Sequence, residues 1–297
     1  MILIDYNQVS LAAILTFQTD LKKDPANARN LIRHIALSNI LQYKKKYGPE
    51  YGEVVICCDG REYWRKEVFP YYKGDRKKKR DDSGVDYKLI FEILAEMRTD
   101  IKEVFPYRVI HLDRAEADDV IAVLCEWSQT NGLIQEGIEE TPQKMIIISE
   151  DMDFPQLQKW SNVYQFAPRK KKMIKMSQRD LYEKYITHIV KAGDDGIPSI
   201  LADDDTLVTV GKRTPPMSAK RLEEFMKLGK AACKNDQELR NWDRNEQLIS
   251  FDKIPQDIKD MIINDYIQST PKRDTMKMMN YLMKHKCRLL LDEVGQF

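Results

Sequence analysis

The sequence predicts an α/β fold in which a mostly parallel central sheet is flanked by helices, with a smaller helical lobe toward the C-terminus. Short runs rich in Ile, Val and Leu alternate with longer segments of helical periodicity, which is the pattern of strands joined by crossover helices. The central runs are almost continuously apolar, as in parallel strands that helices cover on both faces. After about residue 176 the strand signal fades and helical patterns continue.

The predicted elements can be placed in chain order. Strands are expected at residues 2–4, 54–58, 108–112, 145–148 and 163–166. Helices are expected at 27–43, 87–102, 117–127, 177–190, 220–230, 258–268 and 274–290. Ser177 is expected to be the N-cap of the helix that follows it. The predicted organisation is therefore an α/β domain at 1–175 and a helical lobe at 176–297.

The composition is that of a soluble globular protein, since 42% of the 297 residues are hydrophobic and 32% are charged. The formal net charge of +1 neither favours nor excludes a nucleic-acid partner. The five cysteines lack C-x-x-C spacing and the four histidines form no H-E-x-x-H pattern, which argues against zinc. Neither a signal peptide nor a membrane-spanning run is visible, so we expect a cytoplasmic location and no membrane partner.

Acidic residues follow four of the predicted strands near the point where each strand ends. They are Asp5, Asp59, Glu116, Asp118, Asp151 and Asp153. In open parallel sheets the active crevice lies outside the carboxyl ends of the strands, so these acids are expected at one edge. A lone acid in such a place is commonly a turn former or a helix cap. We interpret Asp113 and Glu150 in that way, and expect Asp119 to cap the helix or orient its neighbours.

Carboxylates gathered in this way would repel one another unless cations neutralised them. Hard divalent ions with oxygen ligands provide that neutralisation, and the absence of His and Cys partners favours Mg²⁺ or Mn²⁺ over Zn²⁺. Two such ions about 4 Å apart would clamp the attacking and leaving oxygens of a phosphoryl displacement. The spacing of Asp151 and Asp153 suits a bridge between two ions.

A strongly basic segment at residues 61–80 follows Asp59 directly. It holds nine Lys or Arg residues against three acids, with three tyrosines and one tryptophan among them. Cations beside carboxylates that hold metal suit a polyanionic substrate, and aromatic rings can stack on unpaired bases. The other interpretation of such a run is a solvated loop.

Together these features resemble the 5′ nuclease (flap endonuclease) superfamily, and within it most closely the RNase H group of T-even-type bacteriophages. The resemblance covers nearly the whole chain. It rests on LIDYNQ, VVICCDGREYWRKEVFPYYKGDR, YRVIHLDRAEADDVIAVL, KMIIISEDMDFPQL, KAGDDGIPSIL and GKRTPPMS. The E-A-D-D and S-x-D-x-D-F-x-Q-L motifs, in this order, are highly specific.

The resemblance implies roles by matching position. The implied ligands of a first metal ion are Asp5, Asp59, Glu116, Asp118 and Asp151, and those of a second are Asp153, Asp194 and Asp195. Lys73 and Arg76 fit the family's Y-K-x-x-R element, which sits on a basic helical arch (here about 61–98) and touches the scissile phosphate. Gly196-Ile197-Pro198 fits a helix–hairpin–helix turn that grips duplex through main-chain amides. The implied nucleic-acid contacts are Arg65, Lys66, Tyr72, Lys73, Arg76, Lys77, Gly196, Ile197, Lys212 and Arg213.

One motif departs from the family pattern. The family usually reads G-D-x-x-D-[NG]-I-P, with two acids three residues apart, whereas Asp194 and Asp195 are adjacent here. Asp195 keeps its place before Gly-Ile-Pro. Asp194 matches if a two-residue deletion is allowed, and its alternative role is to cap the next helix.

The activity that the resemblance implies is that of a Mg²⁺-dependent 5′-to-3′ nuclease with two ions, which Mn²⁺ can replace. Expected substrates are DNA duplexes, RNA–DNA hybrids and 5′ flaps, and the expected role is removal of RNA primers from lagging-strand fragments in phage DNA replication. A single-strand-binding protein and a sliding clamp are implied partners of a monomeric enzyme in the cytoplasm of the infected host. The alternatives are a PIN-like endoribonuclease, usually near half this length, and a non-catalytic protein that recognises branched DNA.

Overall fold

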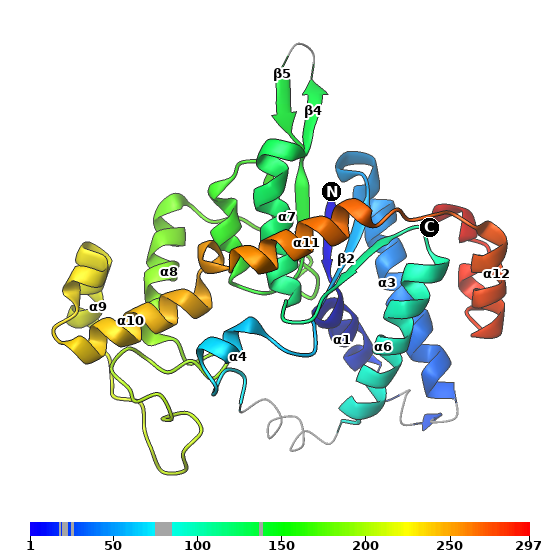
Figure 1. Ribbon diagram of the computed structural model, residues 1–297. Helices are drawn as coiled ribbons and strands as arrows, with labels where there is room; N and C mark the ends of the chain where they lie inside the picture. The colour runs from blue at the N-terminus through cyan, green and yellow to red at the C-terminus, as the bar shows by residue number, and fades with distance from the viewer. Residues whose placement is uncertain (18, 20–22, 25–26, 75–84, 137–138) are drawn as a thin grey trace. The chain divides into compact units, whose positions relative to one another are not determined.

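A six-stranded sheet with the order β3-β2-β1-β6-β7-β8 forms the centre of the first of two compact units (Figure 1). The computed structural model describes residues 1–297 except 18, 20–22, 25–26, 75–84 and 137–138. Five strands are parallel to their neighbours, and β8 (Lys172–Ile174) is antiparallel to β7. The parallel strands are β1 (Ile2–Asp5), β2 (Val54–Cys58), β3 (Arg108–His111), β6 (Met145–Ile148) and β7 (Val163–Ala167). The predicted fold class and the five predicted strands are confirmed.

The direction of strand order changes beside β1. This strand pairs with β2 on one side and with β6 on the other, so that Ile2 lies opposite both Val54 and Ile146. The chain extends the sheet outward through β2 and β3 first, and later through β6, β7 and β8 in the opposite direction. In open α/β sheets a ligand crevice forms where the strand order reverses, at the carboxyl ends. The topology therefore places the expected crevice between the ends of β1 and β6.

Helices cover the sheet of the first unit. They are α1 (Tyr6–Thr16), α3 (Ala28–Tyr51), α6 (Tyr87–Val104), α7 (Ala117–Asn131), α11 (Gln256–Gln268) and α12 (Thr275–Lys284). Alternate strand residues such as Ile2, Ile4 and Ile56 share one buried cluster with α3, α6 and α12. Helix α7 packs against β1 and β2. A separate hairpin, β4 (Leu133–Glu136) and β5 (Glu139–Pro142), follows α7.

The second unit is helical and consists of residues 61–84 and 176–256. Its helices are α4 (Trp64–Val68), α8 (Gln178–Lys191), α9 (Ala219–Leu228) and α10 (Asp236–Ile249). The core contains Phe69, Ile189, Phe225 and Trp242, of which the last two stack with ring centroids 5.8 Å apart. Short 3-10 helices complete the described chain at Phe154–Lys159 (η2), Gly229–Ala232, Phe251–Lys253, Arg288–Leu290 and Val294–Gln296.

The two units divide the chain differently from the expected boundary after residue 175. Residues 257–297 belong with the sheet, because Lys277 donates to the carbonyl of Glu103 at 2.9 Å and Phe297 packs on Phe105. Residues 61–74 of the expected arch belong with the helical unit, whereas its part from 85 onward leads into α6 of the first unit. Residues 75–84 of that arch, including Arg76 and Lys77, lie outside the described residues.

The helical predictions after residue 176 are confirmed at α8, α9, α11 and α12, and Ser177 caps α8 by accepting from the amide of Asp180 at 3.1 Å. A helix–hairpin–helix arrangement was also expected there. However, residues 192–218, all of them described, contain no helix or strand. Consecutive turns follow Pro198 instead. The Thr206 amide donates to the Asp203 carbonyl at 3.1 Å, and the Asp205 side chain accepts from the Thr209 hydroxyl at 2.8 Å. In the described chain no helix is long and apolar enough to span a membrane.

Candidate active site

Asp5 and Asp151 are joined through one hydroxyl at the expected crevice. Asp5 is the last residue of β1 and is 6% exposed. One carboxylate oxygen accepts from the amide of Gln8 at 3.2 Å, which caps α1, and the other accepts from the Ser149 hydroxyl at 3.1 Å. The same hydroxyl oxygen accepts from the amide of Asp151 at 3.0 Å. Ser149 thus couples the acid at the end of β1 to the acid after β6.

Asp59 is positioned by a close approach of two loops. Its Oδ1 accepts from the amide of Ala117 at 3.0 Å, and its Oδ2 accepts from the side-chain amide of Asn7 at 2.9 Å. The next residue, Gly60, donates its amide to the carbonyl of Ala115 at 2.8 Å. A Cβ at residue 60 would lie 2.2 Å from the carbonyl oxygen of Leu112, so glycine is required there. The loop after β2 is thereby held against the start of α7.

The acids at the start of α7 include a capping pair. Glu116 is the N-cap, its side chain accepts from the amide of Asp119, and Asp119 Oδ2 accepts from the Glu116 amide at 2.9 Å. Both side chains are buried. The expectation that Asp119 orients its neighbours is therefore confirmed. Asp118 is half-buried in the first helical turn, where the helix dipole favours negative charge.

Asp153 follows Asp151 in the turn that leads into η2. The amide of Asp153 donates to Asp151 Oδ1 at 2.8 Å, and both side chains are half-buried. The backbone between the strand and this turn is held by α1, since Gln8 Oε1 accepts from the amide of Glu150 at 3.0 Å. The Glu150 carboxylate pairs with Arg169 at 2.7 Å. Glu150 therefore has the structural role that was predicted for it.

The electrostatics of this edge favour bound cations. Burial, followed by the negative charges of Asp59 and Asp151, raises the pKa of Asp5 to about 7, although hydrogen bonds from Gln8 and Ser149 oppose the shift. Among the described residues, no group of three or more His, Cys, Asp or Glu side chains is arranged so that it could hold a metal ion as it stands. The donor set itself fits a hard divalent ion, because it consists of carboxylate oxygens that repel one another. The acids lie at one edge of the sheet. They would have to move closer together to coordinate a bound divalent cation.

Lys73 and Asp195 contact each other within the second unit. The Lys73 ammonium lies 3.6 Å from Asp195 Oδ2, and the Lys73 amide donates to the Asp195 carbonyl at 2.6 Å. The ammonium also lies 5.2 Å and 5.1 Å from the ring centroids of Tyr63 and Tyr72. Asp194 is exposed, and its carbonyl accepts from the amide of Ile197 at 3.0 Å. The lysine predicted to contact phosphate is therefore paired with an aspartate predicted to bind metal.

Several predicted nucleic-acid contacts lie inside the second unit. Arg65 is 3% exposed and donates to the carbonyl of Leu248 at 2.8 Å, so it holds α10. The Ile197 side chain belongs to the core. Gly196 adopts φ +75°, and a Cβ there would lie 2.7 Å from the carbonyl oxygen of Tyr71. In this structure the side chains of Arg65 and Ile197 contribute to packing. The contact expected at Gly196 and Ile197 runs through main-chain amides, so it stays a prediction.

Other predicted contacts are on the surface of that unit. Lys66 is exposed, with its ammonium 5.4 Å from the Tyr63 ring centroid. Lys212 is paired with Asp205 at 2.5 Å, and Arg213 is exposed in the same loop. Tyr72 is buried, and its hydroxyl lies 3.4 Å from Asp195 Oδ2. Lys66, Lys212 and Arg213 are therefore the exposed members of the predicted set among the described residues, and Lys212 is paired with an aspartate.

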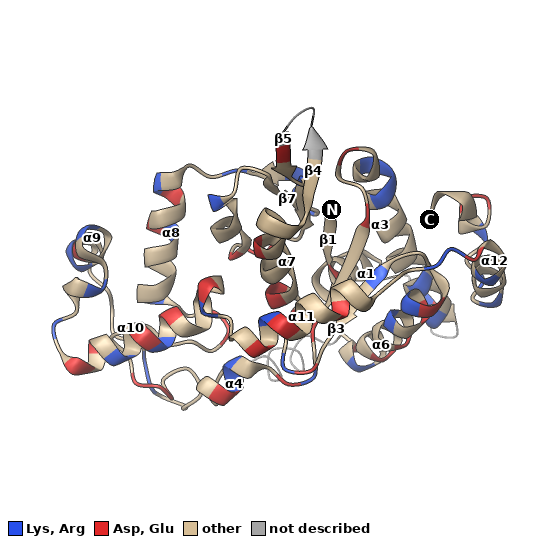
Figure 2. Ribbon diagram, turned by 45° about the horizontal axis from the view of Figure 1, so that its top comes forward, with Lys and Arg blue, Asp and Glu red and all other residues tan. Residues whose placement is uncertain are grey.

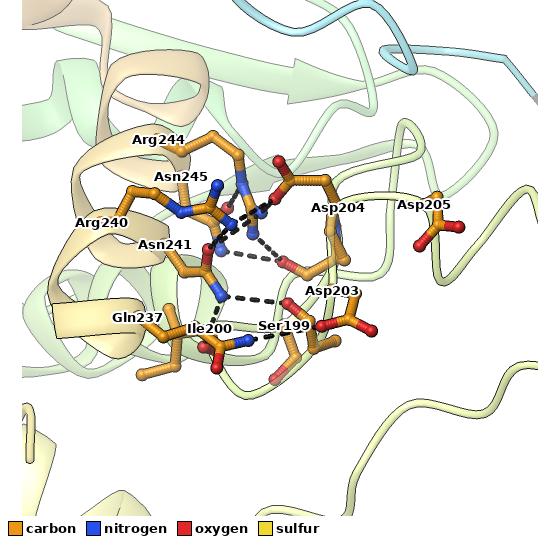
Figure 3. Close-up of polar contacts among 12 residues, drawn as sticks. Ser199, Ile200, Asp203, Asp204, Asp205, Gln237, Arg240, Asn241, Arg244 and Asn245 are labelled. Atoms are coloured by element: carbon orange, nitrogen blue, oxygen red, sulfur yellow. Dashed lines mark hydrogen bonds and ion pairs between the residues drawn. The ribbon is translucent and has the colours of Figure 1, made fainter. Parts of the chain in front are cut away.

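A row of polar side chains on α10 was not predicted from the sequence. Asn241 and Asn245 are fully buried, and each donates two hydrogen bonds from its side-chain amide (Figure 3). The accepting carbonyls, at 2.7–3.0 Å, belong to Ile189, Pro198, Ile200 and Ala202. These bonds give a hydrogen-bond donor to backbone carbonyls at the end of α8 and in the irregular segment after it.

Charged residues extend this row. Arg244 pairs with Asp204 and donates to the carbonyl of Pro198 at 3.0 Å (Figure 3). Burial lowers the pKa of the Arg244 guanidinium, and Asp204 opposes that shift. Arg240 contacts the same aspartate at 3.0 Å, and acidic and basic residues alternate along α10 (Figure 2). Few residues of α10 are apolar for this reason, although those few share one face, and the sequence pattern did not reveal the helix.

The side chains that position the acids were also missed as individual residues. Asn7, Gln8 and Ser149 each bond to a predicted acid or to the backbone beside one. A signal for them existed, because Asn7 and Gln8 end the LIDYNQ motif and Ser149 begins the S-x-D-x-D motif. Their donor and acceptor roles depend on contacts between segments more than 50 residues apart in the chain.

The parallel sheet with acids at its reversal point defines a class of α/β phosphodiester hydrolases, and comparison with known proteins gives the family. The N-terminal resolvase-like domain of 5′-3′ exonucleases matches residues 1–186, and the C-terminal domain of T4 RNase H matches residues 182–297. The ribonuclease H of enterobacteria phage T4 is 32% identical over 304 residues, which cover 99% of this chain and 95% of that protein. The chain belongs to the 5′-3′ exonuclease family.

Solved structures share the fold. The T5 D15 protein co-crystallised with metal ions aligns with a TM-score of 0.59 at 16% identity, over 90% of this chain and 98% of that one. A pseudo-enzyme-product complex of the bacteriophage T5 D15 flap endonuclease with DNA and metal ions aligns with a TM-score of 0.58 at 18% identity, over 90% and 97%. The resemblance recognised from the sequence motifs is therefore confirmed.

Proposed function

We propose that this protein is a divalent-metal-dependent 5′-to-3′ nuclease that hydrolyses phosphodiester bonds in RNA/DNA and DNA/DNA duplexes and at 5′ flaps. The proposed role is the removal of RNA primers from lagging-strand fragments during phage DNA replication. The observation that carries the proposal is the linked set Asp5–Ser149–Asp151 beside Asp59 at the reversal point of the sheet. The near full-length similarity to a phage ribonuclease H supports the substrate class.

The residues that would hold the ions are the acids of the first unit. In our proposal the ligands of the first ion are Asp5, Asp59, Glu116, Asp118 and Asp151, of which Glu116 is also the buried cap of α7. Asp153 extends the set toward a second ion. When bound, Mg²⁺ neutralises these carboxylates and activates water for attack on phosphorus. Mn²⁺ is expected to substitute, because it accepts the same oxygen ligands.

The chain itself supplies the orientation. Asn7 and the Ala117 amide fix both oxygens of Asp59, while Ser149 and the Gln8 amide fix those of Asp5. These bonds restrict rotation of the Asp5 and Asp59 carboxylates, so the direction of each is set before an ion binds. In the second unit the exposed cations Lys66 and Arg213 are proposed to contact the phosphate backbone, without reading its sequence.

Product sizing tests the activity. The substrate is an RNA–DNA strand annealed to DNA with a label at its 5′ end, compared with a 5′-flap DNA and a single-stranded RNA, each with Mg²⁺ or with EDTA. We expect short products from the first two substrates, and only when Mg²⁺ is present. Cleavage of single-stranded RNA in preference to both duplexes would favour a PIN-like ribonuclease. Duplex binding with no cleavage would favour a binding protein.

Two substitutions test the site. Asp118→Asn and Asp151→Asn should each reduce the cleavage rate by orders of magnitude while duplex affinity stays near that of the unmodified protein. Asp113→Asn is the matched control, because Asp113 is an exposed acid a few residues before Glu116 that we assign to a turn. Full activity in both test variants would show that Asp118 and Asp151 are not metal ligands. An equal loss of cleavage rate in the Asp113→Asn control would also contradict the assignment.

A further inference from the structure

Gln165 is a fully buried amide side chain beside the candidate site. It lies on β7, opposite Ile147 of β6, and is 0% exposed. Its Nε2 donates to the carbonyl of Ser149 at 3.1 Å and to the carbonyl of Asp151 at 2.6 Å. Both donor hydrogens are therefore used on the short segment that leaves β6 toward the catalytic edge.

The oxygen of the same side-chain amide, Gln165 Oε1, is buried and makes no hydrogen bond to the described residues. A buried acceptor without a partner destabilises the folded state, and an apolar side chain of similar size would avoid that penalty. Any advantage of glutamine at this position must therefore come from its donor end. Its two donated bonds are the feature that an apolar residue could not supply.

The segment that Gln165 holds is also fixed from other directions, since the Asp151 amide donates to the Ser149 hydroxyl at 3.0 Å. The β6–β7 ladder ends with the bond from the Ser149 amide to the Phe166 carbonyl at 3.2 Å. Beyond it, Gln8 accepts from the amide of Glu150, and Arg169 pairs with the Glu150 side chain. The bond to the Asp151 carbonyl is the contact from β7 that acts on the backbone of the acid itself.

We infer that Gln165 is a positioning residue for Asp151, holding its backbone so that the carboxylate is directed to a divalent ion. Gln165 itself does not touch the ion or the substrate. The inference rests on the proposed function, in which Asp151 is a metal ligand. A partner one step behind a metal ligand typically changes metal affinity or activity by about 10- to 100-fold when it is removed.

The test measures Mn²⁺ binding to the full-length protein without nucleic acid, by calorimetry or by the paramagnetic resonance of free Mn²⁺. Gln165→Leu removes both donors together with the unpartnered acceptor. We expect its Mn²⁺ dissociation constant to rise about 10- to 100-fold. Its melting temperature should fall, because two backbone carbonyls lose a donor, but the protein should stay folded at the temperature of the binding measurement. Gln165→Glu keeps the shape but lacks the amide donors, and it should weaken Mn²⁺ binding as well. This variant keeps the test valid if Gln165→Leu folds poorly.

Asn162→Leu is the matched control. Asn162 precedes β7 at the other end of the strand, and its side-chain amide donates to the carbonyl of Gln143, before β6, at 2.9 Å. Removing this bond should leave the Mn²⁺ affinity unchanged. Wild-type affinity in a folded Gln165→Leu or Gln165→Glu protein would overturn the inference, and so would an equal loss in Asn162→Leu.

Asp151→Asn separates this inference from the proposed function. If that variant binds Mn²⁺ as tightly as the unmodified protein, the metal assignment of Asp151 is wrong and the inference falls with it. If Asp151→Asn weakens Mn²⁺ binding and the Gln165 variants do not, Asp151 is still a metal ligand. Gln165 is then not its positioning residue.

Discussion

Single residues at the sheet edge are under steric as well as chemical constraint. Gly60 is an example, because its missing side chain lets the loop after β2 lie against the carbonyls of Leu112 and Ala115. The contact places Asp59 where the amide of Ala117 can reach it. A glycine beside an acidic residue is a common turn pair, so sequence alone does not reveal that this one joins two distant loops.

Gly60→Ala should therefore separate the two loops. We expect a loss of about 1–3 kcal/mol in the free energy of unfolding, since the new methyl group would overlap backbone atoms. Cleavage should fall further than stability, because Asp59 would lose its position. Urea unfolding and the nuclease assay measure the two effects. Gly48→Ala is the control: a Cβ there meets the flexible Lys44 side chain at 3.4 Å, and stability should hold or rise.

The raised pKa of Asp5 predicts a pH-dependent stability of the metal-free protein. The folded state keeps a proton on Asp5 up to about pH 7, whereas the unfolded chain releases it near the ordinary value of 3.8. The stability contributed by this group is thus complete below that value and is lost as the pH rises through about 7. The melting temperature in EDTA should be higher at pH 5 than at pH 8.

Mg²⁺ should reverse this trend, because it binds the deprotonated acids and so stabilises the folded state at high pH. Asp5→Asn should flatten the decline in EDTA. A melting temperature that is the same at pH 5 and pH 8 in the unmodified protein would contradict the raised pKa of Asp5, which burial and the neighbouring acids cause.

At the scale of elements, α10 shows how a polar helix can organise an irregular segment. Asn245 donates to the carbonyls of Ile189 and Pro198, which lie at the end of α8 and in the turn after it. A carbonyl in the last turn of a helix has no partner within the helix, so a buried side chain must supply one. The asparagines of α10 therefore act on α8 from outside.

Asn245→Leu should reduce the free energy of unfolding by about 2 kcal/mol, because two buried carbonyls would lose a donor. Chemical denaturation monitored by fluorescence gives the value. Gln237→Leu is the control on the same helix, since Gln237 is exposed and its contact with Asp203 is 3.4 Å long. A change of the same size in both variants would mean that burial of the amide donors is not the cause.

The helices and strands differ in how well the sequence predicts them. The five parallel strands were predictable because each is an apolar run bounded by acids or turns, and most helices had one apolar face. The strands β4, β5 and β8 are short and partly polar, and they were not predicted. Helix α1 was missed since its small apolar residues lie on all sides, and α10 since its buried face carries amides. The acids of the site followed from strand ends, whereas Gln165 gave no signal, because its partners are backbone carbonyls.

At the scale of the whole molecule, the sheet depends on the C-terminal residues. Its main core cluster includes Met278, Tyr281, Leu282, Leu290 and Phe297. The Tyr281 hydroxyl also lies 3.0 Å from a carboxylate oxygen of Asp100 in α6. The α/β part of the chain is therefore built from segments at both ends of the sequence, although the patterns along the chain suggested a boundary after residue 175.

A fragment of residues 1–175 should consequently fail to fold as a cooperative unit. Without the last segment, the apolar faces of α3 and α6 that pack against it would be exposed to water. Circular dichroism during heating should show a broad, non-cooperative change for the fragment and a sharp transition for the full chain. A sharp transition in the fragment would show that the α/β segment is complete without residues 257–297.

The contact between Lys73 and Asp195 has a consequence for turnover. A phosphate group that approached this lysine would enter an exchange, displacing a carboxylate that already neutralises the ammonium. The net gain in binding free energy would be the difference between the interaction of Lys73 with phosphate and its interaction with Asp195. This difference is smaller than the gain that phosphate would have from an unpaired lysine. When the phosphate left, the aspartate would recapture the lysine, so the internal anion would favour the departure of a cut strand over its retention.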